Sequence, residues 1–349
     1  MRAPCPRRIV TALFALLGVL TLLTSCALET SGPRTTPEGL PVIKVGYLHT
    51  LAVDSHMWLG LEEGLFEKHG VALEPVKFDT GTALSQALSG GSVDVAVMGA
   101  VLSNFPAQGV GKVFLANDIE FDTAQLWAAP SSGIRSVADL KGKQVITASG
   151  TTAHVFLHNA LRAEGVDPSS LKIINADLPS AVSAFVSGQV PAVALWVPFD
   201  ETVEKQMPDA RMVASAKDYY PQSSIVGGWV ANNNFHEANP ELLSKITGAW
   251  LEANDLLIND RQRALTIVHD AAYADSQSLD DTLRRFEFAR LYTNDEWAQM
   301  YASGDLERQI GNIERIFVEI GGIDRYVDPA DFVDTSIYTN SYNNWKVGS

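Results

Sequence analysis

Short apolar runs alternate with amphipathic stretches along the first two thirds of the chain. The apolar runs are typical of buried strands and cover Val42–Tyr47, Val71–Phe78, Val93–Met98, Gln144–Thr147, Leu171–Ile174 and Ala192–Trp196. Segments with helical spacing follow them, through Trp58, Leu61 and Leu65 up to Gly70, and over Thr82–Ser89, Thr152–Ala163 and Ser180–Val186. This alternation predicts an α/β protein.

Two parts of this pattern repeat along the chain. His69-Gly70-Val71 is echoed by Glu164-Gly165-Val166, and Gly91–Ala96 is echoed by Gly188–Val193. The two offsets, 95 and 97 residues, are nearly equal. The repeat therefore predicts two similar α/β lobes.

From about Pro240 the pattern is helical throughout. Leu242, Ile246 and Trp250 share one helical face, and a firmer apolar stripe over Ile310–Ile320 ends at Gly321-Gly322. We expect a helical C-terminal region with no strand that would add a third sheet.

The first residues have the features of an export signal. Three arginines, at positions 2, 7 and 8, precede the apolar run Ile9–Leu23, which is too short to span a bilayer comfortably. Leu23-Thr24-Ser25-Cys26 resembles a bacterial lipobox, so we predict a lipoprotein signal peptide over 1–25 and lipidation of Cys26. Residues 26–41, rich in Gly, Pro, Ser and Thr, read as a flexible linker. An ordinary cleavage site beside a chance cysteine is the alternative.

Composition excludes several classes of function for the body of the chain. Of 349 residues, 46% are hydrophobic and 19% are charged, which allows a large core and favours two lobes over one. With 26 Lys+Arg against 41 Asp+Glu the net charge is −15, which argues against nucleic acid as a partner. The two cysteines are Cys5 and Cys26, so disulfide frameworks, cysteine zinc sites and cysteine nucleophiles are excluded from the body.

Catalytic and cofactor motifs are not found. No Gly-x-Ser-x-Gly or phosphate-binding loop occurs, and Gly109-Val110-Gly111 lacks the third glycine of a dinucleotide site. His154 and His158 are four residues apart, but Val155 stands where a zinc protease needs glutamate. We therefore predict no catalytic residues, no metal and no cofactor.

Small hydroxyl residues and glycines gather in the turns that follow the predicted strands. These turns contain Thr50 with Asp54–His56, Asp79–Thr82, Met98–Ala100, Ser149–Thr152, and Trp196. In open α/β sheets, ligands bind outside the carboxyl ends of the strands. There the first amides of each helix are unpaired and attract anions. The alternative is that Thr82 and Thr152 are plain N-caps.

An ordered set of segments resembles the solute-binding proteins of nitrate/sulfonate/taurine importers, with the taurine-binding periplasmic proteins most similar. The set comprises Lys77–Ala83, Ala87–Asp94, Ala138–Lys143, Ser149–Thr152, Leu195–Pro198 and Tyr292-Thr293. The resemblance runs from about Val42 to Gly321. It implies a type II periplasmic-binding fold, in which two lobes are joined by two crossing segments. It also implies a monomer in the periplasm or at the cell surface that binds a small molecule and delivers it to an ABC permease and its ATPase.

The resemblance also implies where the lobes divide. We expect one lobe to comprise 42–126 and 230–349, and the other to comprise 127–229. The cleft between them would open and close about crossings near Trp127 and Trp229.

The turns and the resemblance together give the candidate ligand-binding residues Thr50, Asp54, His56, Gly81, Gly99, Ala100, Gln125, Thr151, Thr152, Trp196, Gly228 and Trp229. The resemblance assigns the acid group of the ligand to Gly81, Gly99, Ala100, Thr151 and Thr152. It assigns a ligand amine to Asp54, and the tryptophans could stack on a planar or cationic group.

Two departures from the taurine pattern leave the ligand open. Val226-Gly227-Gly228 has no acid where taurine binders carry a second carboxylate, and Ala100-Val101 replaces the usual pair of serines. Glycines at 227 and 228 would leave room for a larger substituent. Taurine, another sulfonate, a carboxylate, a quaternary amine or a thiamine-precursor pyrimidine are the candidates. A secreted lipoprotein enzyme acting through His49 and His56 is the alternative from another class.

Overall fold

The computed structural model describes residues 34–220, 222–223 and 225–348. The predicted signal peptide, Cys26 and most of the linker predicted for 26–41 lie outside the described residues. Residues 35–349 form one compact unit. Within the described residues, no helix is both long enough and apolar enough to cross a membrane.

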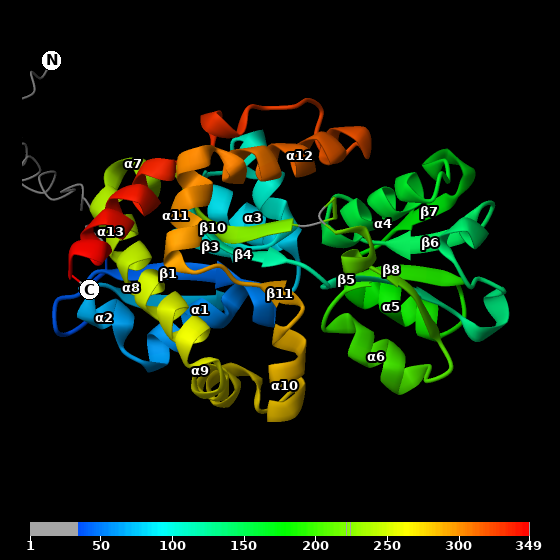
Figure 1. Cartoon of the computed structure of the whole chain (residues 1–349), viewed down its shortest axis with the longest axis horizontal. Coiled ribbons are helices and arrows are strands. Elements are labelled where there is room, and N and C mark those ends of the chain that lie inside the picture. The colour runs from blue at the N-terminus through cyan, green and yellow to red at the C-terminus, as the bar shows by residue number, and fades with distance from the viewer. Residues whose placement is uncertain (1–33, 221, 224, 349) are drawn as a thin grey trace, which may run out of the picture. The chain divides into compact units, whose positions relative to one another are not determined.

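Two mixed sheets organise this unit (Figure 1). The first has the order β11-β4-β10-β3-β1-β2 and is formed by β1 (Val42–Tyr47), β2 (Ala72–Lys77), β3 (Val95–Met98), β4 (Lys112–Glu120), β10 (Ile225–Ala231) and β11 (Ala289–Arg290). The second has the order β7-β6-β8-β5-β9 and is formed by β5 (Ala124–Ala128), β6 (Gln144–Thr147), β7 (Lys172–Asn175), β8 (Ala192–Trp196) and β9 (Arg211–Ser215).

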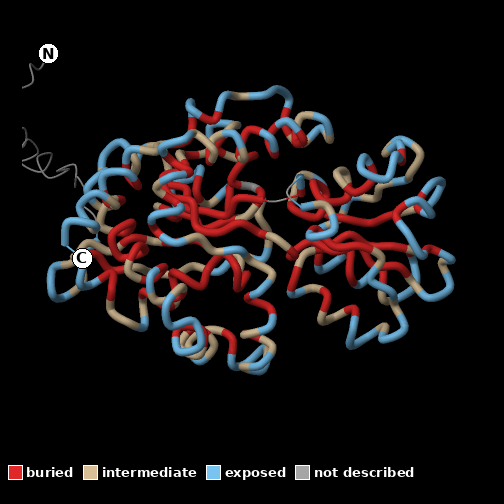
Figure 2. Tube along the Cα trace, viewed as in Figure 1, coloured by how far each residue is buried: buried red, intermediate tan, exposed pale blue. Residues whose placement is uncertain are grey.

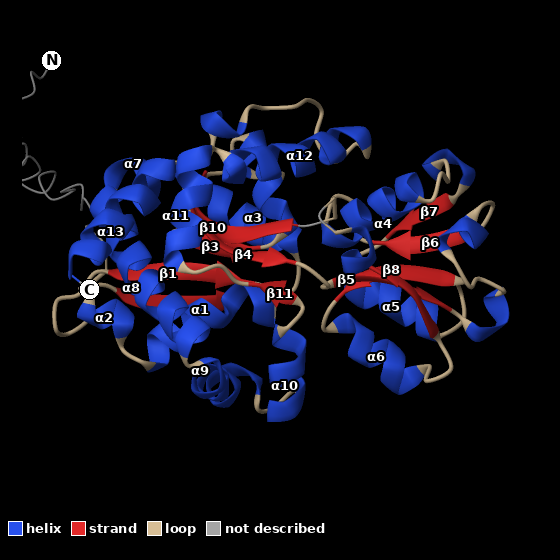
Figure 3. Cartoon of the chain, in the orientation of Figure 1, coloured by secondary structure: helices blue, strands red, loops and turns tan. Residues whose placement is uncertain are grey.

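The helices follow the parallel strands, as the sequence pattern predicts (Figure 3). Those of the first two thirds are α1 (Leu51–Glu62), α2 (Leu65–Lys68), α3 (Gly81–Ser89), α4 (Thr152–Ala163), α5 (Leu178–Val186) and α6 (Phe199–Gln206). The C-terminal part is helical, with α7 (Asn233–Ala238), α8 (Pro240–Asn259), α9 (Arg261–Val268), α10 (Leu279–Phe286), α11 (Asn294–Ser303), α12 (Asp305–Glu319) and α13 (Thr335–Gly348). Its one short strand, β11, joins the first sheet and adds no third sheet.

Four strands of five or more residues were not expected from the sequence: β4, β5, β9 and β10. Strands β4 and β10 are buried in the middle of the first sheet, where β10 runs antiparallel to both β3 and β4. Polar residues at 117, 118 and 120 interrupt the apolar run of β4, and two glycines interrupt that of β10. Neither strand therefore shows the plain apolar or alternating pattern from which strands are recognised.

The chain changes sheet between β4 and β5, and returns between β9 and β10. The expected lobe boundaries, 126/127 and 229/230, fall inside β5 and β10, so both changes of sheet come earlier in the chain. The division into two moving lobes stays a prediction. Figure 2 shows that the buried part of the chain follows the strands of both sheets and the inner helix faces.

Candidate functional site

An inner cavity of about 40 Å³ lies where strands of both sheets end at their carboxyl edges. Its lining contains seven of the predicted residues, namely Thr50, Gly81, Gly99, Ala100, Thr151, Thr152 and Trp196, together with Leu48, Val53 and Glu120. The structure therefore brings together turns that follow β1, β2, β3, β6 and β8. This is the edge at which open α/β sheets bind their ligands.

Four helical segments begin at the inner cavity. Helices α1, α3 and α4 start at Leu51, Gly81 and Thr152, and a short 3₁₀ turn covers Ala100–Ser103. The first amides of each segment have no partner within it and carry partial positive charge. The cavity therefore suits a negatively charged group even though no lysine or arginine of the described chain lines it.

The two threonines that begin α4 differ in what their hydroxyls can donate. Thr151 Oγ1 donates to the carbonyl of Ala148 over 2.7 Å, so its proton is engaged within the turn. Thr152 is buried, lines the inner cavity and has no hydrogen bond from its side chain among the described residues. Of these two hydroxyls, only that of Thr152 is free to donate to a group in the cavity.

A larger groove of about 620 Å³ shares Gly81, Thr151 and Trp196 with the inner cavity and is called the outer groove here. It runs between Asp79–Thr82, Asn175–Pro179 and Ile320–Gly322, and its described lining contains no lysine or arginine. Trp196 meets Phe199 edge-on in its wall, with ring centroids 6.1 Å apart. The inner cavity is narrow, and the outer groove that adjoins it is wider and partly aromatic.

Asp54 and His56 line neither the inner cavity nor the outer groove. Asp54 is buried on α1, where it accepts hydrogen bonds from Tyr273 over 2.6 Å and Trp58 over 3.2 Å, and His49 lies 3.6 Å away. A ligand amine would have to displace these partners.

His56 is fully buried against α8. Its Nε2 lies 3.0 Å from Oδ1 of Asn254, its ring stacks on Trp250, and burial lowers its pKa to about 4. Neither His49 nor His56, the two histidines of the enzyme hypothesis, is among the described residues that line the inner cavity.

Gln125, Gly228 and Trp229 are also buried in the core, away from both spaces. Gln125 accepts a hydrogen bond from the indole of Trp127 over 2.8 Å, and Trp229 donates to Asn117 over 3.1 Å. A Cβ on Gly228 would lie 2.4 Å from the carbonyl oxygen of Leu115. The glycines at 227 and 228 therefore accommodate neighbouring side chains and backbone rather than a larger ligand.

Glu120 is the residue that the sequence analysis missed. It is the last residue of β4, which runs in the same direction as β1 and β3, so its side chain reaches the same sheet edge. The carboxylate is 3% exposed, lines the inner cavity and accepts a hydrogen bond from Thr123 over 2.7 Å. Burial raises the pKa of Glu120 to about 7. A run of polar residues at the end of a buried strand is the signal that could have identified it.

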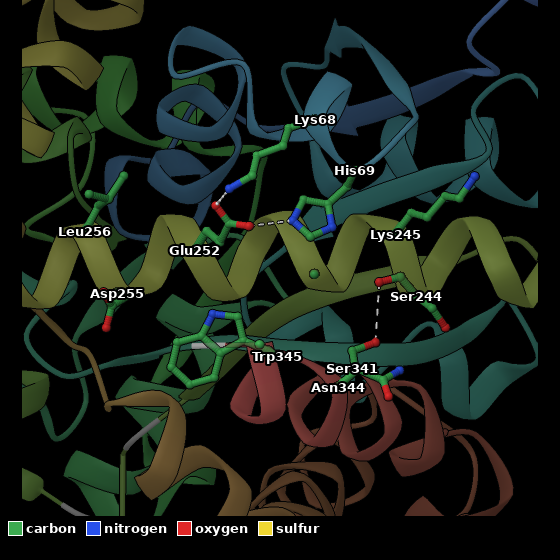
Figure 4. A pocket seen from close by; sticks show the side chains of 12 residues that line it. Lys68, His69, Ser244, Lys245, Glu252, Asp255, Leu256, Ser341, Asn344 and Trp345 are labelled. Carbon is green, nitrogen blue, oxygen red and sulfur yellow. Dashed lines mark hydrogen bonds and ion pairs between the residues drawn. The ribbon is translucent and has the colours of Figure 1, made fainter.

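Another cavity, of about 650 Å³, lies between α2, α8 and α13 (Figure 4). Figure 4 shows the side chain of Glu252 joined by dashed lines to Lys68 and His69. The ion pairs are 2.5 Å long to Lys68 and 2.7 Å long to His69, so these charges are already paired. None of its lining residues comes from the carboxyl end of a strand. We do not place the ligand site there.

His154 and His158, the two histidines on α4 that the sequence analysis considered, lie in different environments. His158 Nε2 lies 2.9 Å from Glu319, and burial lowers the pKa of His154 to about 4. Among the described residues, no group of three or more His, Cys, Asp or Glu side chains could hold a metal ion.

Known proteins share this fold along most of their length. The alkanesulfonate-binding protein of Xanthomonas axonopodis pv. citri, solved with bound MOPS, superimposes with a TM-score of 0.64 at 20% identity, covering 84% of this chain and 98% of that one. This likeness confirms the predicted periplasmic-binding fold with two α/β parts and a helical C-terminal region.

Relatives are also found by sequence. A protein of Brucella abortus that is named as a binding protein is 27% identical over 92% of this chain and 96% of its own length. The taurine-binding periplasmic protein of Escherichia coli is 24% identical over 54% of this chain and 58% of its own length. The model of the family described as NMT1/THI5 like matches residues 55–264, more than half of the chain, and the protein therefore belongs to the NMT1/THI5-like family.

Proposed function

We propose that this protein is an extracytoplasmic solute-binding protein of an ABC importer, and that it captures a small sulfonate in the inner cavity and outer groove. The observation that carries the proposal is the convergence of four helical starts on a cavity that no cation lines. Family membership and the sulfonate and taurine ligands named for its relatives support it.

The chemistry of the site suits capture and release. Backbone amides at Gly81, Ala100 and Thr152 hold a negative group by charge-assisted hydrogen bonds, which strengthen where water is excluded. The net charge of −15 opposes an anion at long range, so these local dipoles must supply the attraction. Movement about the two changes of sheet would close the outer groove over the ligand, and a monomer would then present it to the permease and its ATPase.

A ligand panel tests this function. Taurine, isethionate, a longer alkanesulfonate, a carboxylate, a quaternary amine and a thiamine-precursor pyrimidine are each added to the protein while its melting temperature is recorded. A ligand that binds only the folded state raises that temperature, and we expect the sulfonates to do so. A shift by the pyrimidine alone would overturn the sulfonate assignment. Product analysis after each incubation checks for turnover, which a binding protein should not show.

The variant Thr152→Val, measured with the best ligand of this panel, tests whether the ligand binds at the inner cavity. Loss of its free hydroxyl should weaken the best sulfonate by about 1–3 kcal/mol, the effect of leaving a charged partner short of one donor. Thr339→Val is the matched control, because this threonine lies on the exposed side of α13, far along the chain from the cleft turns. Titration calorimetry on both variants measures the difference. An unchanged affinity for Thr152→Val would place the ligand elsewhere.

We also propose that the protein is tethered to the membrane through Cys26. The evidence is the apolar run that ends in Leu23-Thr24-Ser25-Cys26. Mass spectrometry of the exported protein should find a lipidated N-terminus at Cys26, and Cys26→Ala should be released or left unprocessed. An exported chain that begins elsewhere, with no lipid, would contradict the proposal.

A further inference from the structure

We propose that Glu120 selects the ligand, by pairing with a cationic nitrogen on a solute whose anionic end lies at the helix starts. The inference rests on the proposed function and narrows it from sulfonates in general to zwitterionic ones. It assigns a ligand-contacting role to a residue that neither the turn pattern nor the expected amine partner, Asp54, had indicated.

The first argument is the position of the Glu120 carboxylate. Its Oε2 accepts the hydrogen bond from Thr123, whereas Oε1 has no hydrogen-bond partner among the described residues. Oε1 lies against Gly99, close enough that a Cβ at that position would be 2.0 Å away. The absence of a side chain at Gly99 therefore allows the carboxylate to reach the inner cavity, which Thr50, Ala100 and Thr152 also line.

The second argument is that no cation of the described residues pairs with this carboxylate. On its own strand the neighbouring acid is Asp118, whose pKa is raised by burial and by Glu120. Two cations close to this end of β4 are engaged elsewhere: Lys217 pairs with Asp122 at 3.1 Å, and Arg290, which stands opposite Ile119 on β11, donates to Tyr220 at 3.0 Å.

Within the part of the chain that the structure describes, the remaining elements around Glu120 bring no positive side chain either. Ile225 of β10 and Ala289 of β11 stand opposite Glu120, the α1 start contributes Thr50 and Val53, the α4 start contributes Thr152, and β8 contributes Trp196. A buried carboxylate is costly unless a partner compensates it. An ammonium group on the ligand would supply that partner, whereas a simple anion would add a further negative charge.

A matched pair of probes tests the inference. Taurine and isethionate are both two-carbon sulfonates, but taurine has an ammonium group where isethionate has a neutral hydroxyl. For the unchanged protein at pH 8, we expect calorimetry to show that taurine binds at least tenfold more tightly. Glu120→Gln keeps the shape and the acceptor for Thr123, and should weaken taurine at least tenfold while isethionate binds equally well or better. Glu252→Gln, a paired glutamate on α8, is the control and should change neither affinity.

The pH dependence gives a second readout. Pairing with an ammonium group needs ionised Glu120, so taurine affinity should fall about tenfold from pH 8 to pH 6, through the raised pKa near 7. Glu120→Gln should abolish this dependence. A protonated Glu120 that donates to the ligand would produce the opposite slope for taurine, with tighter taurine binding at pH 6, and would overturn the inference.

The outcomes also separate this inference from the function on which it rests. If the unchanged protein binds neither probe nor any other sulfonate, the proposed function fails and the inference fails with it. If it binds both probes alike, and Glu120→Gln alters both alike, only the inference is overturned. If circular dichroism shows that Glu120→Gln folds poorly, Glu120→Asp is used instead. It keeps the negative charge on a side chain that is one methylene shorter, and it should lower taurine affinity more than isethionate affinity.

Discussion

Asn117→Leu should lower the free energy of unfolding by about 3–6 kcal/mol. The Asn117 side chain is fully buried, and its Oδ1 accepts hydrogen bonds from the indoles of Trp250 over 2.7 Å and Trp229 over 3.1 Å. Its Nδ2 donates to the carbonyl of Val53 over 2.8 Å. Leucine would leave the two buried indole N–H groups without partners, at about 1–3 kcal/mol each, and would also remove the bond to Val53.

The position of Asn117 explains why no neighbour can replace it. The pairing of β4 with β10 shifts register between Gly227 and Gly228, so Asn117 has no opposite residue there. Such a bulge redirects a side chain out of the alternating pattern. It places the amide between α1, α8 and β10 at once.

Urea denaturation measures the effect, with Asn259→Leu as the control. Asn259 is at the exposed end of α8, where surface substitutions usually change stability by less than about 0.5 kcal/mol. Trp229→Phe removes a single donor and should cost less than Asn117→Leu, while ligand affinity stays unchanged. A loss of less than about 1 kcal/mol for Asn117→Leu would contradict the role assigned to this amide.

Arg285→Met should destabilise the fold by about 3–5 kcal/mol, because it leaves a buried carboxylate without its partner. Arg285 lies on α10 and is 5% exposed, and its Nη1 donates to both oxygens of Asp200, on α6, over 3.0 and 2.9 Å. Its Nε also forms an ion pair with Glu201 at 3.0 Å. The pair joins α6, which connects β8 to β9 of the second sheet, to α10, which precedes β11 of the first.

Two further variants make this prediction specific. Arg284→Met is the control, since the neighbouring arginine is exposed and its i,i+3 pair with Asp281 contributes only about 0.5 kcal/mol. In Asp200→Leu/Arg285→Met both charges are removed, and most of the lost stability should return. Urea denaturation of the three variants compares them. Equal losses for Arg284→Met and Arg285→Met would contradict the importance of the buried pair.

The amino-acid sequence by itself determined the parallel α/β frame and most of the cavity floor. Strands such as Val42–Tyr47 and helices such as Thr152–Ala163 were predicted with the bounds that the structure has. Period and turn residues are local properties, so they can be recognised without knowledge of any partner. The positions of Gly81, Gly99 and Thr152 at the cavity can be predicted from this strand pattern, because the carboxyl ends of parallel strands meet at one sheet edge.

Tertiary structure alone decided which polar side chains enter the cavity. Asp54 was a reasonable ligand contact by its place in the first turn, yet its carboxylate is held by Tyr273, which is more than 200 residues away along the chain. Glu120 lies in β4, which the sequence pattern did not identify as a strand because polar residues interrupt it. Its side chain reaches the cavity only because β4 joins the sheet beside β10. Long-range pairing fixes such neighbours, and no local pattern of hydrophobic and polar residues encodes it.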